Sequence, residues 1–119
     1  MTATRHDIVI EQGSAFTMNV QALNENKTVK DLTGYDARMQ IRSSITSSGT
    51  LLSATTSGGQ ITINAPGGIV MVRVGADVTA VLTFNDAVYD LEVYKSGDVT
   101  EVIRLVEGFV SLSPEVTRP

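Results

Sequence analysis

The chain has 119 residues, of which 42% are hydrophobic and 18% are charged, and its formal net charge is −4. This composition is typical of one globular domain and excludes a disordered chain, and the absence of cysteine excludes disulfides and thiolate metal sites. The nine Lys and Arg residues are scattered, and no apolar run approaches the roughly 20 residues of a membrane span, so we expect neither a nucleic-acid partner nor a membrane partner.

Short segments that alternate apolar and polar residues recur along the chain, with Gly, Asn, Asp and Ser between them. In chain order the pattern predicts strands at residues 6–12, 15–23, 27–30, 35–43, 51–54, 60–64, 68–74, 88–95 and 99–112. Between the first two strands, the stretch "EQGS" predicts a hairpin or a sharp bend at Gly13. The fold class expected is all-β, an immunoglobulin-like antiparallel β-sandwich of about seven to nine strands that forms a single domain over residues 1–119.

Residues 35–43 give the clearest strand. Four apolar residues, Tyr35, Ala37, Met39 and Ile41, alternate with four polar ones, Asp36, Arg38, Gln40 and Arg42. The apolar side is expected to face the core, and the charged side faces either water or a neighbouring subunit. The polar stretch "SSITSSGT" that follows predicts an exposed, mobile loop.

One helical turn is predicted near residues 76–82, where Val78, Val81 and Leu82 have helical spacing and Asp77 is a candidate N-cap. The last strand changes phase, because Ile103 and Leu105 are odd-numbered while Val110 and Leu112 are even-numbered. This shift predicts a β-bulge at residues 107–108. Pro114 should end the strand, so residues 114–119, like residues 1–5, are predicted to be extended assembly arms.

The sequence predicts no catalytic, cofactor or metal site. His6 is the only histidine, and no nucleophile motif accompanies it. Asp86, Asp90 and Glu92 form the densest carboxylate group, but they lack the spacing of a calcium loop and are interpreted as a solvated sheet face. We therefore expect the protein not to be an enzyme and to use no cofactor.

The aromatic residues are mostly expected in the core: Phe16, Tyr35, Tyr89 and Phe109. Tyr94 is the exception, because its alternation places it on the outer face beside Asp90 and Glu92. An outward tyrosine is typical of interfaces and is also found singly on ordinary surfaces. If the protein is instead a carbohydrate- or receptor-binding β module, these three residues are the candidate site.

Three stretches carry a family resemblance: "IEQGSAFTMNV", "DLTGYDARMQIR" and "YDLEVYKSGDVTEVIRLVEGFVSLSPEVTR". Together they resemble, in order and over nearly the whole chain, the N-terminal β-sandwich of upper baseplate proteins of phages that infect lactic-acid bacteria. The chain is also similar to short single-domain proteins encoded among phage head and tail genes. The stretch "DLTGY" before an alternating strand is the most specific of these motifs.

The resemblance implies a structural protein of the virion of a tailed bacteriophage, made in the host cytoplasm and present in many symmetric copies. Its partners would be other virion proteins of the tail, baseplate, fibre or capsid. The chain lacks the long C-terminal extension of a receptor-binding arm, so an adaptor in the tail or baseplate is expected, with capsid decoration as the alternative. The expected interface residues are Asp36, Arg38, Arg42, Tyr94, Glu115, Val116 and Arg118.

Overall fold

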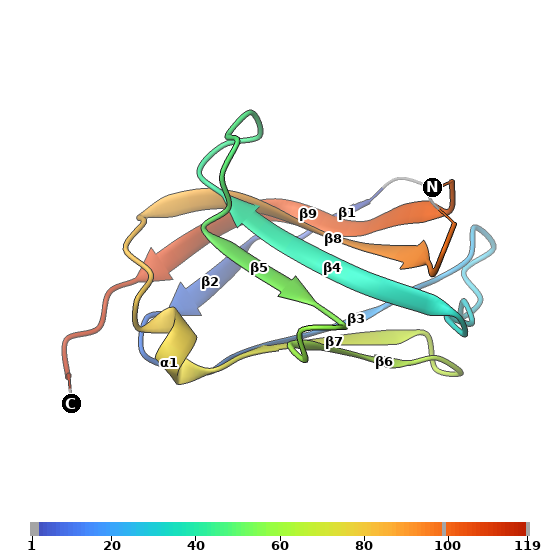
Figure 1. The fold of residues 1–119 in the computed structure, drawn as a ribbon, viewed down its shortest axis with the longest axis horizontal. Coiled ribbons are helices and arrows are strands. Elements are labelled where there is room, and N and C mark those ends of the chain that lie inside the picture. Colours follow the sequence, from blue (N-terminus) through green and yellow to red (C-terminus); the bar gives the residue numbers. More distant parts are fainter. Residues whose placement is uncertain (1–2, 99, 119) are drawn as a thin grey trace.

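The computed structural model describes residues 3–98 and 100–118 and contains two β-sheets packed face to face, with one short helix at one end (Figure 1). The larger sheet is formed by β1 (Thr4–Arg5), β2 (Ile8–Glu11), β4 (Tyr35–Arg42), β5 (Leu52–Thr55), β8 (Asp86–Lys95) and β9 (Val102–Ser113). The smaller sheet is formed by β3 (Phe16–Gln21), β6 (Ile61–Asn64) and β7 (Ile69–Val74), and the helix α1 spans Ala76–Thr79. The predicted all-β sandwich with one helical turn is confirmed.

The first two strands pair in a direction that the expected antiparallel sandwich does not include. Both β1 and β2 run parallel to β9, with Thr4 beside Val106 and Ile8 beside Val110. Thr4 and Arg5 therefore belong to the sheet, which corrects the predicted assembly arm over residues 1–5; residues 1–2 of that arm lie outside the described residues. The predicted arm at residues 114–118 does leave the sheet, because β9 ends before Pro114, and residue 119 lies outside the described residues.

The chain passes between the sheets at both edges of the sandwich. Because β2 belongs to the large sheet and β3 to the small one, the stretch around Gly13 is a sharp bend and not a hairpin. Gly13 has a φ of 84°, which glycine adopts without a steric penalty. At the opposite edge the chain crosses from β5 to β6.

The core lies between the two sheets and follows the predicted alternation. From the large sheet, Ala37, Met39 and Ile41 of β4 are fully buried, as are Leu91 and Val93 of β8. The small sheet contributes Val70, Val72 and Val74 of β7. Each large aliphatic side chain buried in this way stabilises the fold by about 1.5–3 kcal/mol.

The predicted β-bulge exists in β9, but two residues earlier than expected. The pairing with β8 passes from Leu91 opposite Val106 to Glu92 opposite Arg104, so that Leu105 is the extra residue. Leu105 and Val106 are consecutive and both buried. Beyond the bulge the even-numbered residues of β9 face the core, and Phe109, which was expected in the core, instead lies on the outer face with 56% of its surface exposed.

Gly108 is a glycine because the link between β1 and β2 crosses directly over it. A Cβ atom at this position would collide with the His6 carbonyl oxygen and lie 2.7 Å from an Asp7 carboxylate oxygen. The same link is held by three hydrogen bonds. The His6 N–H donates to Glu107 (2.9 Å), the Tyr89 hydroxyl donates to the His6 carbonyl (2.5 Å), and the Phe109 N–H donates to the Asp7 carboxylate (2.9 Å).

The helix α1 is attached to the bend at Gly13 by a buried threonine. Thr79 is fully buried; its hydroxyl donates to the Ser14 carbonyl (2.8 Å) and accepts from the Gly13 N–H (3.1 Å). The prediction that Asp77 caps the helix is wrong, because the N-cap is Gly75 and it makes no side-chain capping bond. Asp77 lies in the first turn instead, where a negative charge favours the helix dipole.

Three turns at the other end of the sandwich share one arrangement, an Asp or Asn followed two residues later by Thr. In each, a side-chain oxygen of the first residue accepts from the backbone N–H and the hydroxyl of the threonine, which is an Asx turn. The pairs are Asn26 with Thr28, Asp31 with Thr33, and Asp98 with Thr100, and each hydroxyl contact measures 2.6 Å.

We expect Gly108→Ala to lower the free energy of unfolding by about 1–3 kcal/mol, because the added Cβ must displace the backbone of His6. Chemical denaturation followed by circular dichroism measures this change. The matched control is Gly49→Ala, whose added Cβ meets no atom within 4 Å and should change the stability by less than about 0.5 kcal/mol. Equal stability of the two variants would contradict the crowding at Gly108.

Candidate functional site

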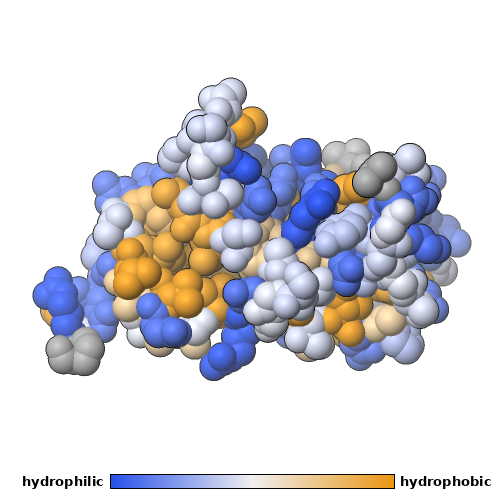
Figure 2. All heavy atoms as spheres, viewed as in Figure 1, coloured by the Kyte–Doolittle hydropathy of each residue, from blue (hydrophilic) through white to orange (hydrophobic). Residues whose placement is uncertain are grey.

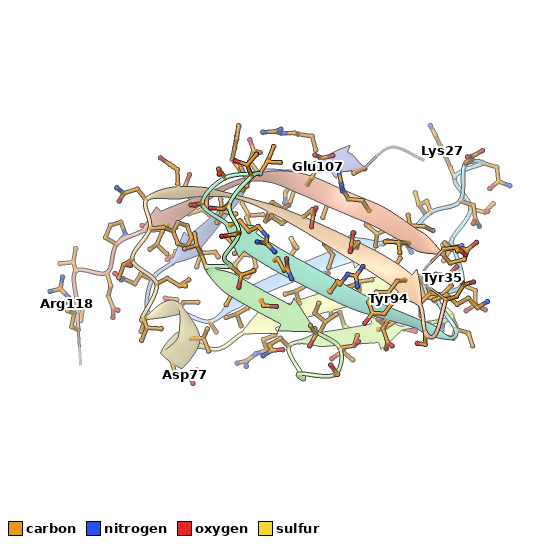
Figure 3. The ribbon with its side chains drawn as sticks, turned by 45° about the horizontal axis from the view of Figure 1, so that its top comes forward. Lys27, Tyr35, Asp77, Tyr94, Glu107 and Arg118 are labelled. Carbon is orange, nitrogen blue, oxygen red and sulfur yellow. The ribbon has the colours of Figure 1, made fainter. Side chains whose placement is uncertain are left out.

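The outer face of the large sheet contains most of the residues predicted to form an interface. Asp36, Arg38 and Arg42 project from β4. Tyr94 projects from the neighbouring β8 (Figure 3). All four are half-buried within the single chain. Their burial comes from contacts with one another and with nearby loops.

Arg38, Glu92 and Tyr94 form one cluster across β4 and β8. Arg38 lies opposite Glu92 in the register, and its Nε donates to the Glu92 carboxylate at 2.5 Å. The same guanidinium lies over the ring of Tyr94, 4.5 Å from its centroid, in a cation–π contact. One face of the Tyr94 ring is therefore occupied by a neighbour within the chain.

Asp36 connects three segments at one end of this face. Its carboxylate accepts from the Thr56 hydroxyl (3.1 Å), which follows β5, and from the Ser96 hydroxyl (2.7 Å), in the turn after β8. These are charge-assisted hydrogen bonds, which are stronger than those between neutral groups. Asp36 thus has a structural role in the described chain.

Arg42 holds the loop at residues 43–50, which was predicted to be mobile. Its guanidinium donates to the carbonyls of Ser47 (2.9 Å) and Gly49 (3.3 Å) and to the side chain of Gln40 (2.8 Å). The loop stands above the outer face of the sheet (Figure 1). At its tip Ile45 is 87% exposed, which is unusual for an isoleucine in a polar loop.

A hollow of about 420 Å³ lies on the outer face, between this loop and β9. Its lining includes the apolar residues Ile45, Val88 and Phe109, and the charged residues Asp90, Arg104 and Glu107. The guanidinium of Arg5, also in the lining, lies over the Phe109 ring at 4.4 Å from its centroid and pairs with Asp7 at 3.3 Å.

At the charged side of the hollow, the guanidinium of Arg104 lies near two carboxylates, those of Asp90 and Glu107. Arg104 lies 3.4 Å from Asp90 and 3.7 Å from Glu107. Burial raises the pKa of Asp90 above its ordinary value, and the Arg104 guanidinium opposes that shift. Among the residues that the structure describes, no three His, Asp or Glu side chains are close enough together to hold a metal ion.

The sequence did not identify the hollow. Val88 pairs with Phe109 across β8 and β9, so the two form the apolar floor once Phe109 faces outward. The signal was present in the phase change of the last strand. With Val110 and Leu112 facing the core, a bulge at either position places Phe109 on the outer face, so the expectation of Phe109 in the core conflicted with the predicted phase change.

The C-terminal interface residues lie elsewhere. Arg118 is at the opposite end of the molecule from Tyr94 (Figure 3). The Glu115 N–H donates to the Gln12 side chain (2.9 Å), and the Glu115 carboxylate lies against Gly13. Val116 is 90% exposed. The seven predicted interface residues therefore belong to two separate regions, the outer face and the tail.

His6 lies at the link between β1 and β2, where its side chain is exposed and its carbonyl accepts the Tyr89 hydroxyl. Burial raises the pKa of Tyr89 to about 12, and the nearby Asp7 carboxylate adds to this shift. The contact is structural, because it holds the link over Gly108.

Comparison of the sequence with protein-family models gives no match, and comparison with curated proteins gives no significant relative. Within residues 3–98 and 100–118, no helix is long and apolar enough to cross a membrane. The geometry of the described surface is therefore the basis on which a function is proposed.

We expect Tyr89→Phe to lower the free energy of unfolding by about 0.5–1.5 kcal/mol at neutral pH, because the part-buried hydrogen bond from the Tyr89 hydroxyl to the His6 carbonyl is lost. In the natural protein, stability should also fall as the pH rises from about 10, where the phenol ionises in the unfolded chain, to about 12, where it ionises in the folded protein. The variant should lose that part of the pH dependence.

Denaturation at a series of pH values measures both effects. Tyr94→Phe is the matched control, since its ring lies on the outer face, and it should retain the alkaline fall. An identical alkaline profile for the natural protein and Tyr89→Phe would contradict the raised pKa.

We expect Arg42→Met to increase amide hydrogen exchange in residues 43–50 by about tenfold or more, because the loop loses two hydrogen bonds. The free energy of unfolding should change by less than about 1 kcal/mol, since the guanidinium is partly exposed. Arg73→Met, which changes an exposed arginine on the small sheet, is the control and should leave the loop unchanged. Unchanged loop exchange in Arg42→Met would show that other contacts hold the loop.

Proposed function

We propose that the protein is a non-enzymatic structural subunit of a tailed-phage virion, present in many copies as an adaptor in the tail or baseplate. The observation that carries the proposal is an apolar area on an acidic protein, open to solvent between β5 and α1. Figure 2 shows apolar side chains gathered at this end of the sandwich. Val81, two residues after α1, is 74% exposed, and Val78 of α1 and Leu51, directly before β5, are also exposed.

Gathered apolar surface of this kind is typical of a site that another protein covers. Single exposed apolar residues are ordinary, but Figure 2 shows apolar side chains gathered between β5 and α1, two elements that are far apart in the sequence. The edge strands β5 and β6 are only four residues long, which limits uncontrolled pairing through the sheet edges. Side-chain contacts at the opening are thus better suited to specific assembly than edge pairing.

The family resemblance supports the same reading. Its first stretch corresponds to β2, the bend and β3, its second to the turn before β4 and β4 itself, and its third to β8, β9 and the tail. These segments build the centre of the large sheet, one of its edges, and one edge of the small sheet. An adaptor role follows from the resemblance, and the open apolar area supplies a surface for it.

The contacts of Tyr94 favour assembly over carbohydrate binding. A sugar-binding site needs a free aromatic face beside free polar groups. Here Arg38 covers one face of Tyr94 and pairs with Glu92, while Asp90 pairs with Arg104. Capsid decoration uses the same kind of surface as a tail adaptor, and the position in the particle separates the two.

The proposal predicts that the protein is present in purified particles of the phage that encodes it, in a fixed ratio to the major structural proteins. Quantitative mass spectrometry of separated heads and tails measures this ratio: enrichment in tails supports the adaptor, and enrichment in heads indicates decoration. Absence from both fractions would contradict the proposal.

Val81→Asp should reduce incorporation into particles by about tenfold or more, because it places a charge on a surface that must be desolvated. Val29→Asp is the matched control, since Val29 is an exposed valine outside β5 and α1. Circular dichroism of both purified variants verifies that each is folded. Equal incorporation of the two variants would show that the area between β5 and α1 is not the assembly surface.

A further inference from the structure

The tail that follows β9 is attached to the rest of the chain through one residue. Within the described tail, residues 114–118, one hydrogen bond reaches the body of the protein: the Glu115 N–H donates to the side-chain oxygen of Gln12 (2.9 Å). Glu115 is half-buried, whereas Val116 is 90% exposed, and the chain then projects away from the sandwich (Figure 1). The position of the tail therefore depends on how the Gln12 side chain is held.

The same Gln12 side chain also holds the segment that follows α1. Its amide nitrogen donates to the Leu82 carbonyl (2.8 Å), far along the chain. One amide group thus accepts from the tail with its oxygen and donates to the α1 segment with its nitrogen. Because the amide group is planar, both hydrogen bonds need one orientation of the Gln12 side chain. An amide oriented by the tail is therefore already oriented toward Leu82.

Leu82 closes the turn that carries two exposed valines, Val78 and Val81. The N–H groups of Ala80, Val81 and Leu82 donate to carbonyls three or four residues earlier, at 3.0, 3.3 and 3.1 Å. Leu82 is buried, while Val78 and Val81 are 37% and 74% exposed. The hydrogen bond from Gln12 to the Leu82 carbonyl is thus one of the contacts that set where the two valines lie.

The bend next to Gln12 touches the same two segments. The Gly13 N–H donates to the Thr79 hydroxyl of α1 (3.1 Å), and the Glu115 carboxylate lies so close to Gly13 that a Cβ atom there would collide with it. Figure 1 shows α1 and the tail at the same end of the sandwich. Two consecutive residues, Gln12 and Gly13, therefore join the tail to α1.

We propose that Gln12 is a latch that couples the C-terminal tail to α1. While the tail is docked, its hydrogen bond orients the Gln12 amide toward Leu82, and the turn that carries Val78 and Val81 is held in place. When the tail is drawn away, the amide regains rotational freedom and the turn is loosened. By linkage, a partner that binds the ordered turn also favours the docked tail, and a partner that takes the tail weakens binding at the turn.

The latch deepens the proposed function, and its meaning for assembly rests on that function. Val78 and Val81 belong to the apolar area that we propose another virion protein covers. The tail then controls whether this area is presented in its ordered form. The latch itself is a property of the single chain, so it is tested on the purified protein without particles.

Hydrogen exchange of single backbone amides, followed by NMR on the full chain, tests the coupling. Glu115→Pro removes the N–H that donates to Gln12. It should raise the exchange rates of the Ala80, Val81 and Leu82 amides by about fivefold or more, because the freed side-chain amide holds the Leu82 carbonyl less firmly. Gln12→Leu removes both hydrogen bonds, so it should raise these rates at least as much and the rate of the Glu115 amide as well.

Two variants are the matched controls. Glu115→Gln keeps the N–H and changes only the carboxylate. Gln21→Leu removes a different glutamine amide, which donates from β3 to the Gly67 carbonyl (3.2 Å). Both controls should leave exchange in residues 80–82 at the rates of the natural protein, and circular dichroism verifies that every variant is folded.

Three results would each overturn the latch. Exchange in residues 80–82 is unchanged in Glu115→Pro, or it is unchanged in Gln12→Leu, or Glu115→Gln raises it as much as Glu115→Pro does. The last result would show that the carboxylate beside Gly13 holds the tail and α1 together, and not the Gln12 amide.

These results are separate from the test of the proposed function. A latch that fails in the purified protein leaves the virion role standing. Absence of the protein from particles overturns the virion role and leaves the coupling between the tail and α1 as measured.

Discussion

The structure depends on one added residue in its longest strand. β9 pairs with β8 along nearly its whole length and with β1 and β2 on its other side. Its core-facing residues are odd-numbered in the first part of the strand and even-numbered in the second, so one extra residue is needed between the two parts. Leu105 is this extra residue: it has no partner on β8, and its side chain is buried. Beyond it, Gly108 faces inward beneath His6, while Glu107 and Phe109 face outward. The hollow on the outer face is a direct result of that shift.

The charged face of the large sheet is stabilised chiefly by contacts within the chain. Arg38 is paired with Glu92 and stacked on Tyr94, Asp36 joins two turns, and Arg42 holds a loop. Partly exposed ion pairs of this kind contribute little stability individually, typically below about 1 kcal/mol. Their effect here is geometric, because Arg42 fixes the loop beside the hollow and Arg38 fixes the ring of Tyr94. The apolar side chains left in solvent then stand out as the surface available to other molecules.

The sequence predicted the strands well because their signal is local. In residues 35–42 and 86–95 the alternation alone assigns every side chain to the core or to the outer face. The parallel pairing of β1 and β2 with β9 was not predicted, because strand direction depends on connections across the whole chain. The bulge was predicted near Gly108 because a glycine in a strand often marks a bulge. This position requires a glycine for a different reason, because the backbone of His6 passes so close that a Cβ atom would collide with it.

The candidate site was predicted only in part for the same reason. Arg38, Arg42 and Tyr94 were assigned correctly to the outer face, but the contacts among them follow from the register of β4 and β8, which no single segment contains. Phe109 and Arg104 come from a strand whose facing changes midway. Predicting the hollow from the sequence would therefore have required the register of β8 and β9, the position of the bulge and the conformation of the loop together.

The two ends of the sandwich are built from different chemistry, and they should respond differently to acid. At one end, hydrogen bonds from Thr33 and Thr100 hold the pKa of Asp31 and of Asp98 below the ordinary value, so these turns are favoured only while the carboxylates are ionised. That contribution is present above the pKa of the unfolded chain and is lost as the pH falls through the lowered one. At the other end, the hydroxyl of Thr79 joins α1 to Gly13 and does not titrate. Acid therefore weakens the turns at Asp31 and Asp98, while the contacts of the Thr79 hydroxyl are unaffected by pH.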